Sequence, residues 1–351
     1  MIALIMAGGS GKRFWPLSRR DLPKQYLKII SDRSLIQMTY DRLLPVFSPH
    51  DIYVITSVSQ KHLIKEHLPE LPEANIILEP CARNTAPCIG LSSIFLRGIR
   101  HSSENMLVLP SDHYISDSSL FFSSIQLAEK VSREGYLVTF GIKPTYPATG
   151  FGYIESGEEI LAGSRKVIQF KEKPVLKDAL EFINRGNFFW NSGMFMWSIS
   201  SILDAIADHM PDLFKALEII SGRWKNEGVN IDFSQEYSLL PHIPIDIGVM
   251  EKASNKAVIP VSYGWSDLGS WQTLYNMKEH DKEGNFFSGL SATINSKGNL
   301  VIAGKLVSLI DIDDLIIIDT GDILLITPRN SSEKVKRMVD KLEKEGREKE
   351  I

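Results

Sequence analysis

The first third of the chain alternates short apolar runs with segments of helical periodicity. The apolar runs are rich in β-branched residues and are continuous rather than alternating, at residues 2–6, 52–55, 76–78 and 106–109. Helical periodicity fills the intervals, near residues 35–44, 60–67 and 87–100. Continuous apolar strands are typical of a parallel sheet that helices cover on both faces. The sequence therefore predicts an α/β fold: a Rossmann-like mixed, mostly parallel sheet with helices on both faces.

The rest of the chain has two different textures. Between about residues 145 and 256 the expected strands are shorter, and helices are expected near 177–184 and 199–224, as in an insertion on the sheet. From residue 285 onward, short apolar runs are separated by Gly and Asp turns, and residues 332–350 have amphipathic helical spacing. We therefore predict a main domain over residues 1–284 and a small β appendage over 285–351 that ends in a helix.

The charge balance restricts the possible partners. The chain has 351 residues with 39 Lys and Arg against 43 Asp and Glu, a formal net charge of -4, so it has no overall attraction to nucleic acid or to an anionic membrane. The apolar run at residues 2–6 is too short for a signal peptide, and no later run approaches the length of a membrane span. We expect a cytoplasmic protein without nucleic-acid or membrane partners. We interpret Cys81 and Cys88 as packing residues.

A glycine-rich loop with basic residues follows the first expected strand. Ala7-Gly8-Gly9-Ser10-Gly11-Lys12-Arg13 is followed by Pro23-Lys24-Gln25. Glycines allow backbone N–H groups to approach a polyphosphate closely, and Arg13 and Lys24 add positive charge. We interpret this loop as a seat for a nucleoside triphosphate, with a plain glycine turn as the structural alternative.

Two better-known glycine loops are excluded by single positions. A P-loop requires glycine where Met6 stands and Ser or Thr where Arg13 stands. The dinucleotide-binding fingerprint requires a third glycine where Phe14 stands, and Pro16 and Pro23 prevent a helix from opening there.

With these residues the chain resembles the sugar-1-phosphate nucleotidylyltransferases, and most closely the mannose-1-phosphate guanylyltransferases. Trp15-Pro16-Leu17-Ser18-Arg19 favours the mannose branch. The resemblance covers about the first 280 residues and continues through the motifs at 79–87, 110–113, 149–154, 170–174, 190–195, 245–252 and 264–271. It implies a nucleotidylyltransferase catalytic domain over 1–284 and an appendage that resembles a short left-handed β-helix. The implied reaction joins the GMP moiety of GTP to mannose 1-phosphate, giving GDP-mannose and pyrophosphate.

This reaction needs no protein base, because a phosphate monoester has a second pKa of about 6 and is already largely dianionic near neutral pH. The protein must instead supply position and positive charge. Mg²⁺ prefers a few carboxylates together with phosphate oxygens and water. The resemblance implies that Asp112 and Asp267, each of which follows an apolar run, hold Mg²⁺. A cap or turn role is the alternative for either one.

The resemblance assigns the other site residues in groups. Arg13 and Lys24 grip the triphosphate and, together with Asp112 and Asp267, form the catalytic set. The nucleotide-binding set adds Ala7, Gly8, Gly9, Gly11, Glu79, Arg83, Asn84 and Ser111. The sugar-phosphate-binding set is Gly152, Tyr153, Glu172, Lys173, Asn191, Gly193 and Asp246.

Some of these residues have structural alternatives. Asn84 is equally suited to cap a helix. Glu172 and Lys173 are adjacent on an expected strand and would face opposite sides unless the backbone is distorted near Pro174, so an exposed ion pair is the alternative. We interpret Lys12 as ordinary surface charge and His113 as structural.

The expected partners are GTP and mannose 1-phosphate. Exposed apolar edges of the β appendage also favour a homodimer. The same chemistry on another hexose 1-phosphate or nucleoside triphosphate is the first alternative function. A non-catalytic relative that senses a nucleotide sugar is the second.

Overall fold

The computed structural model describes residues 1–9, 11–228 and 231–351, so Ser10 of the glycine-rich loop lies outside the described residues. The described chain forms two compact units. The large unit consists of Met1–Gly8, Thr39–Ser111 and Ile115–Trp265, and the small unit of Gly9–Met38, Asp112–Tyr114 and Ser266–Ile351. Among the described residues, the helices are all too short or too polar to cross a membrane.

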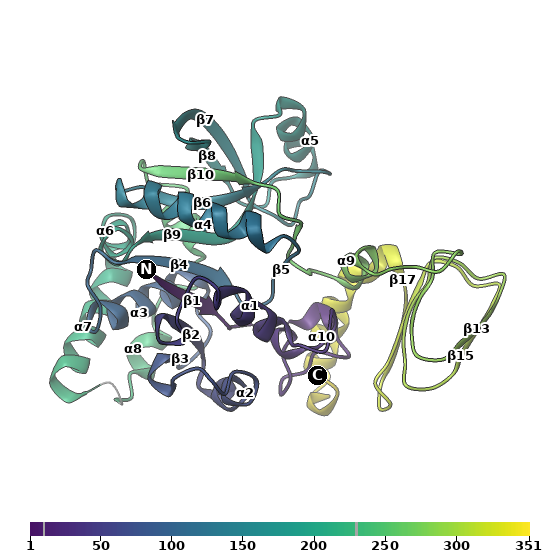
Figure 1. Cartoon of the computed structure of the whole chain (residues 1–351). Coiled ribbons are helices and arrows are strands. Elements are labelled where there is room, and N and C mark those ends of the chain that lie inside the picture. Colours follow the sequence, from purple (N-terminus) through teal and green to yellow (C-terminus); the bar gives the residue numbers. More distant parts are fainter. Residues whose placement is uncertain (10, 229–230) are drawn as a thin grey trace. The chain divides into compact units, whose positions relative to one another are not determined.

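A nine-stranded sheet forms the centre of the large unit, in the order β3-β2-β1-β4-β9-β6-β10-β8-β7 (Figure 1). Its strands are β1 (Ile2–Met6), β2 (Ile52–Ser57), β3 (Ile76–Glu79), β4 (Asn105–Pro110), β6 (Leu137–Ile142), β7 (Tyr153–Leu161), β8 (Ser164–Lys171), β9 (Phe188–Ser198) and β10 (Lys256–Val261). β1 pairs in parallel with β2 and β4, and β6 pairs in parallel with β10, while β8 and β9 run against their neighbours. The predicted mixed, mostly parallel sheet is confirmed.

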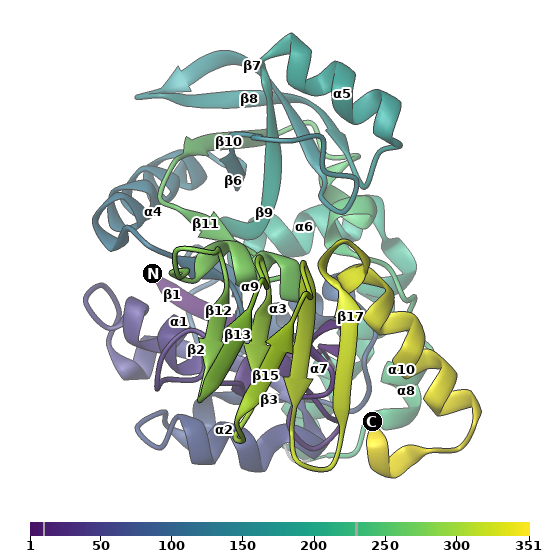
Figure 2. The same cartoon turned by 90° about the vertical axis from the view of Figure 1, so that its right-hand side faces the viewer.

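Helices cover both faces of this sheet. The helices are α1 (Leu35–Leu43), α2 (Lys61–His67), α3 (Thr85–Arg97), α4 (Ser118–Arg133), α5 (Leu176–Arg185), α6 (Ile199–His209), α7 (Pro211–Glu227) and α8 (Ser234–Ser238). α1 begins in the small unit and ends in the large one. α4 lies on one face, and α3, α6 and α7 pack together on the other (Figures 1 and 2). The single helix predicted over 199–224 was wrong, because Pro211 ends one helix and starts the next at a position where its missing N–H costs nothing.

The core of the large unit follows from the strand period of two. Ile2 and Leu4 of β1 and Met106 and Val108 of β4 point to the face covered by α3 and α6 and are fully buried there. The intervening Ala3 and Ile5 of β1 are also fully buried. Burial on both faces explains why these runs are continuously apolar.

The small unit contains the β appendage. Its strands are β12 (Phe286–Ser288), β13 (Ser291–Ile294), β14 (Leu300–Ile302), β15 (Val307–Ile310), β16 (Leu315–Asp319) and β17 (Leu324–Pro328). β12, β14 and β16 stack in parallel, β13 pairs in parallel with β15, and β17 closes the first of these sheets as an antiparallel strand (Figure 2). Successive coils are joined by buried asparagines: the Asn299 N–H donates to Asn285 Oδ1 at 2.9 Å, and the Leu315 N–H donates to Asn299 Oδ1 at 2.9 Å.

The compact units do not follow the predicted boundary at residue 284. Helix α9 (Trp271–Met277) and the carboxy-terminal helix α10 (Val335–Lys344) share one buried core with the amino-terminal loop. That core combines Phe14 and Trp271 with Leu300, Ile316 and Val339. Segments far apart in the sequence therefore bury their apolar side chains together, which spacing along the chain does not reveal. Strands β5 (Tyr114–Ile115) and β11 (Trp265–Ser266) lie where the chain passes from one unit to the other.

Candidate active site

A polar cavity of about 360 Å³ lies within the small unit. All four residues of the predicted catalytic set line it. The full lining is Gly11, Lys12, Arg13, Phe14, Lys24, Asp112, His113, Asp267, Leu268, Gly269 and Lys336. A common cavity is the geometric condition that the assigned roles require, and the roles themselves stay predictions.

Lys24 is the centre of this cavity's ion network. Its ammonium lies 2.8 Å from Asp112 Oδ2 and donates to the backbone oxygen of Asp267 at 2.7 Å. The same ammonium lies 5.7 Å from the ring centroid of Phe14, which packs against Trp271. Lys24 is only 7 % exposed, so burial and these contacts hold its side chain in one position.

The two aspartates have different surroundings. Burial by itself would raise the pKa of Asp112, but the charges of Lys24 and His113 and the hydrogen bond from Lys24 lower it below its ordinary value. Asp267 Oδ1 accepts a hydrogen bond from the Gly269 N–H at 3.1 Å, and Leu268 between them has a left-handed φ of 46°. Asp267 therefore does form the turn that was its structural alternative, and it lines the cavity as well.

Two glycines of the loop differ in whether a side chain would fit in their place. Gly11 has φ 60°, and a Cβ there would collide with the side chain of Lys24 and lie 2.8 Å from its backbone nitrogen. The Gly11 carbonyl accepts a hydrogen bond from Ser18 Oγ at 2.8 Å. Gly9 has φ 124° and nothing within 4 Å of an added Cβ. Close approach of the loop to Lys24 thus depends on Gly11 and not on Gly9.

The basic residues beside Gly11 are bound by acids from the carboxy-terminal segment of the small unit. Lys12 Nζ lies 3.0 Å from Asp340 Oδ1 and 2.6 Å from Glu343 Oε2, both on α10. Arg13 Nε lies 3.5 Å from Glu333 Oε2. The interpretation of Lys12 as ordinary surface charge was wrong, because its two ion pairs link the loop to residues more than 300 positions away.

The predicted sugar-phosphate residues gather in the large unit around Asn191 of β9. Asn191 Nδ2 donates to Asp246 Oδ1 at 2.7 Å, and Asn191 Oδ1 accepts from Thr139 Oγ1 at 3.0 Å and from the Gly193 N–H at 3.2 Å. Gly193 has φ 70°, a conformation that brings its N–H back to this oxygen. These contacts fix which end of the Asn191 amide is the donor and which is the acceptor.

Glu172 and Lys173 lie just beyond the end of β8. The backbone is distorted here, because Lys173 has a left-handed φ of 44°, so the two side chains do not follow strand alternation. Lys173 Nζ lies 2.6 Å from Glu172 Oε1, which is the ion pair of the alternative interpretation. Glu172 also lies beside Gly152, where an added Cβ would come within 2.7 Å of Glu172 Oε2. Glycine at 152 therefore leaves space for this carboxylate.

Asp246 begins a short π-helical turn, Asp246–Met250. Burial and, to a smaller extent, the nearby Glu172 carboxylate raise the pKa of Asp246 to about 7, against the opposing effects of the Lys173 charge and the hydrogen bond from Asn191. A carboxyl group that titrates near neutral pH both accepts and donates hydrogen bonds, which suits contact with hydroxyl groups.

Tyr153 does not offer its side chain to a ligand. The ring is fully buried and packs against Phe182 at 5.4 Å between centroids. The backbone of Tyr153 pairs with both β8 and β9, and the sugar-binding role of this residue stays a prediction. The sequence motif at 149–154 does not indicate which of its side chains are buried in the core and which face a ligand.

Several residues predicted to bind the nucleotide also belong to the large unit. Asn84 caps α3, with its Oδ1 accepting from the Thr85 N–H at 2.8 Å, so it performs the role that was its structural alternative. Glu79 is 4 % exposed and accepts a hydrogen bond from Tyr237 at 2.9 Å; burial raises its pKa to about 6. A Cβ at Gly8 would lie 3.0 Å from Glu79 Oε1.

The other predicted nucleotide residues of this unit are mostly engaged through their backbones. The Ala7 carbonyl accepts from Thr56 Oγ1 at 3.1 Å, and the Ser111 carbonyl accepts from Thr39 Oγ1 at 3.1 Å. Arg83 is different, because its Nε is buried without a hydrogen-bond partner among the described residues.

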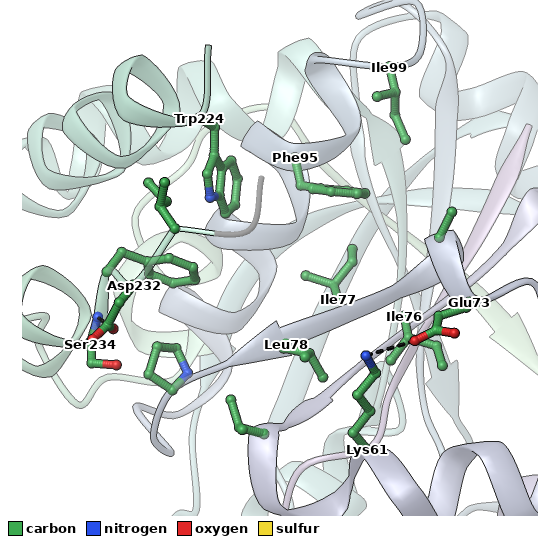
Figure 3. Close-up of a pocket in the computed structure, with 15 residues that line it drawn as sticks. Lys61, Glu73, Ile76, Ile77, Leu78, Phe95, Ile99, Trp224, Asp232 and Ser234 are labelled. Atoms are coloured by element: carbon green, nitrogen blue, oxygen red, sulfur yellow. Dashed lines mark hydrogen bonds and ion pairs between the residues drawn. The ribbon is translucent and has the colours of Figure 1, made fainter. Parts of the chain in front are cut away.

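The large unit also contains a cavity of about 610 Å³ that sequence analysis did not predict (Figure 3). Its walls are mainly apolar and come from β3, α3, the end of α7 and residues 231–234, with Ile77, Phe95 and Trp224 among them. Lys61 and Glu73 form an ion pair of 2.9 Å at one side. None of the predicted site residues lines this cavity.

Sequence reasoning missed three residues of these clusters. Thr139 hydrogen-bonds Asn191 from the neighbouring strand β6, and strand pairing cannot be read from a single sequence. His113, interpreted as structural, lines the small-unit cavity 4.0 Å from Asp112 Oδ1, and its place next to Asp112 was the available signal. Lys336 also lines that cavity, from α10, and no motif marks it.

Two protein-family models match this chain. A nucleotidyl transferase family model matches residues 2–284, and a model described as MannoseP isomerase/GMP-like beta-helix domain matches residues 290–342. The chain therefore belongs to the nucleotidyl transferase family.

Proteins similar to this chain over almost its whole length share both parts. A mannose-1-phosphate guanylyltransferase of Salmonella muenchen is 38% identical over 99% of this chain and 74% of its own length. The alginate biosynthesis protein AlgA of Pseudomonas putida is 36% identical over 99% of this chain and 72% of its own. A crystal structure described as a mannose-1-phosphate geranyltransferase from Thermus thermophilus superposes with a TM-score of 0.88 at 30% identity, covering 97% of this chain and 99% of that one.

Proposed function

We propose that this protein transfers the GMP moiety of GTP to mannose 1-phosphate, giving GDP-mannose and pyrophosphate. The proposal is supported by family membership and by whole-length relatives that carry the name of this activity. The observation that carries it for this chain is the convergence of Arg13, Lys24, Asp112 and Asp267 on one cavity. Such a cavity, rich in fixed cations, suits a ligand with several negative charges.

The small-unit cavity is the proposed site of the triphosphate. Arg13 and Lys24 would bind phosphate oxygens and balance charge on the α-phosphate and on the departing pyrophosphate. Lys24 is already oriented by Asp112 and by the Asp267 carbonyl, so it need not be ordered when the nucleotide binds. The ion pair between Arg13 and Glu333 is long and exposed, and a phosphate group can replace the carboxylate.

Asp112 and Asp267 fit the requirements of Mg²⁺. Both carboxylates line the cavity, and Asp112 is kept ionised by its cationic neighbours. The described residues contain no group of three or more His, Cys, Asp or Glu side chains that could enclose a metal ion. Mg²⁺ needs only one or two carboxylates when phosphate oxygens and waters complete its shell, so the pair is sufficient. A bound Mg²⁺ would neutralise phosphate charge, and Asp112 and Asp267 would hold it.

The proposed site of mannose 1-phosphate is the group of polar residues around Asn191 in the large unit, here called the large-unit cluster. Asn191 and Asp246 present donor and acceptor atoms that match sugar hydroxyls, with Glu172 beside them at Gly152. Lys173 is largely exposed and can leave Glu172 for the sugar phosphate. No side chain is assigned as a general base, because the phosphate of mannose 1-phosphate is already largely dianionic near neutral pH.

Pyrophosphate release by the purified protein tests the proposal. We expect release that requires GTP, mannose 1-phosphate and Mg²⁺ together, and we expect GDP-mannose as the other product. The control replaces GTP by ATP, UTP or dTTP and mannose 1-phosphate by glucose 1-phosphate. Preference for another pair would assign the same chemistry to different substrates, and binding of GDP-mannose without any turnover would favour a sensing role. The cytoplasmic location and the homodimer also remain predictions.

A further inference from the structure

One cation of the small-unit cavity comes from the β appendage. Lys336 lies in the first turn of α10 and lines the cavity together with the loop residues Gly11–Phe14. The other side chains of α10 that matter here are Asp340 and Glu343, which hold Lys12. Residues 336, 340 and 343 follow one another at spacings of four and three, so they occupy one face of the helix. The contacts of Lys12 show that this face is turned toward the loop.

The opposite face of α10 explains why the helix is held in this position. Val335, Val339 and Leu342 are buried in the core that also contains Phe14 and Trp271. Because Phe14 directly follows Arg13, the same core positions both the loop and the helix. The side chain of Lys336 is therefore presented at the cavity by a packed helix and not by a free tail.

Lys336 differs from the other cations of the cavity, each of which forms an ion pair with a carboxylate. Lys24 is paired with Asp112, Lys12 with Asp340 and Glu343, and Arg13 with Glu333. Within residues 1–9, 11–228 and 231–351, no hydrogen bond or ion pair is found for Lys336. Lys336 is exposed, and an ammonium without an ion-pair partner at the wall of a cavity attracts anions. A lysine binds phosphate as a point charge without a fixed geometry.

We propose that Lys336 binds phosphate groups of the nucleoside triphosphate, and of the pyrophosphate that is released, so that helix α10 of the β appendage is part of the nucleotide site. This inference rests on the proposed function for the identity of the nucleotide. It adds a residue beyond the match to the nucleotidyl transferase model, which ends at residue 284. It also gives the appendage a direct role in substrate binding.

The test compares Lys336→Gln and Lys336→Arg with Lys344→Gln in the full-length protein. Lys344 is an exposed lysine at the other end of α10 and does not line the cavity, so its replacement makes the same charge change on the same helix. We expect Lys336→Gln to raise the KM for GTP and the Kd for pyrophosphate about three- to tenfold, as for one partly solvated contact with an anion. The kcat and the KM for mannose 1-phosphate should stay unchanged. Lys336→Arg should remain within about twofold of the wild type because it keeps the charge.

Equal GTP and pyrophosphate affinities in Lys336→Gln and the wild type would overturn the inference. An equal loss in Lys344→Gln would also overturn it, because the effect would then belong to the overall charge of the helix. Calorimetric titration with pyrophosphate alone separates this inference from the proposed function. If the wild type binds pyrophosphate but does not convert GTP and mannose 1-phosphate, the reaction is wrong while the difference between the Lys336 variants still tests the phosphate contact.

Discussion

The small-unit cavity and the large-unit cluster each present a predicted aspartate, and the surroundings shift the pKa values of the two in opposite directions. Lys24 and His113 lower the pKa of Asp112 against the effect of burial. Burial and the Glu172 carboxylate raise the pKa of Asp246 to about 7. In the proposed function, this difference would allow one residue type to serve two kinds of ligand. A permanently ionised carboxylate holds cations among phosphates, whereas a carboxyl group that shares its proton near neutral pH suits sugar hydroxyls.

Removal of the charge network in the small-unit cavity should have the largest effect. Lys24→Gln and Asp112→Asn each break the 2.8 Å pair; Asp112→Asn leaves the buried Lys24 ammonium without this partner, and Lys24→Gln leaves the half-buried Asp112 carboxylate without it. We expect kcat/KM to fall by about 10³-fold or more, since each loses electrostatic stabilisation of the reacting phosphates. Steady-state pyrophosphate release measures this.

The apolar cavity of the large unit supplies the matched control for these variants. Lys61 forms an ion pair with Glu73 at its side, so Lys61→Gln also removes a paired lysine from a cavity wall. We expect its kcat/KM to stay within about twofold, because exposed pairs contribute little. A comparable loss in Lys61→Gln would mean that the activity does not distinguish the two cavities.

Substitution of the loop glycines should separate backbone strain from a collision. Gly11→Ala places a Cβ against the side chain and backbone of Lys24, whereas Gly9→Ala meets nothing within 4 Å. Both residues have positive φ, so an alanine is strained at either position, and the φ of 124° at Gly9 is no easier for an alanine than the φ of 60° at Gly11. We therefore expect Gly11→Ala to lower kcat/KM at least about tenfold further than Gly9→Ala by displacing Lys24. Equal losses would show that only the φ angle matters.

Asn191→Ala tests the proposed binding of mannose 1-phosphate in the large unit. The variant leaves Asp246 and Thr139 without their shared partner. We expect the KM for mannose 1-phosphate to rise about ten- to hundredfold, as for loss of hydrogen bonds that involve a charged group, with the KM for GTP little changed. Asn255→Ala is the control, because it removes an exposed asparagine that donates to the Gly135 carbonyl elsewhere in the same unit. A larger rise in the KM for GTP would contradict the division of the substrates.

The smallest expected effect is on the pH dependence of the free energy of unfolding. The folded protein holds the Asp246 proton up to about pH 7, whereas the unfolded chain releases it near the ordinary value of 3.8. Between these values the folded state binds more protons, so the contribution of Asp246 to the free energy of unfolding is largest below about pH 4 and decreases as the pH rises toward 7. For one group this slope reaches at most about 1.4 kcal/mol per pH unit.

Denaturant unfolding of the wild type and Asp246→Asn over pH 4 to 8 measures this slope. Asparagine does not titrate, so the difference in unfolding free energy between the two proteins should change across this interval and level off above pH 7. Glu79, with a pKa raised to about 6, contributes a slope of the same sign in both proteins and cancels in the difference. If the unfolding free energies of the two proteins depended on pH in the same way, the raised pKa of Asp246 in the folded state would be wrong.

The order of strands and helices and the nature of the glycine-rich loop could be predicted from the sequence, because apolar periodicity and glycine placement are local properties. The break at Pro211 was present in the sequence and was missed, while the capping role of Asn84 was foreseen as an alternative. The distortion at Lys173 was expected as a condition of its role, and the structure contains it.

Local sequence patterns were enough to predict the α/β architecture, the basic glycine-rich loop and the candidate acidic and basic side chains. The folded chain was needed to show that α10 holds Lys12 and that Thr139 fixes the Asn191 amide. It was also needed to show that Tyr153 belongs to the core and that Lys336 lines the cavity. The physical reason is that these features depend on contacts between residues 50 to more than 300 positions apart, and on burial, neither of which is encoded in the local pattern around any one of them.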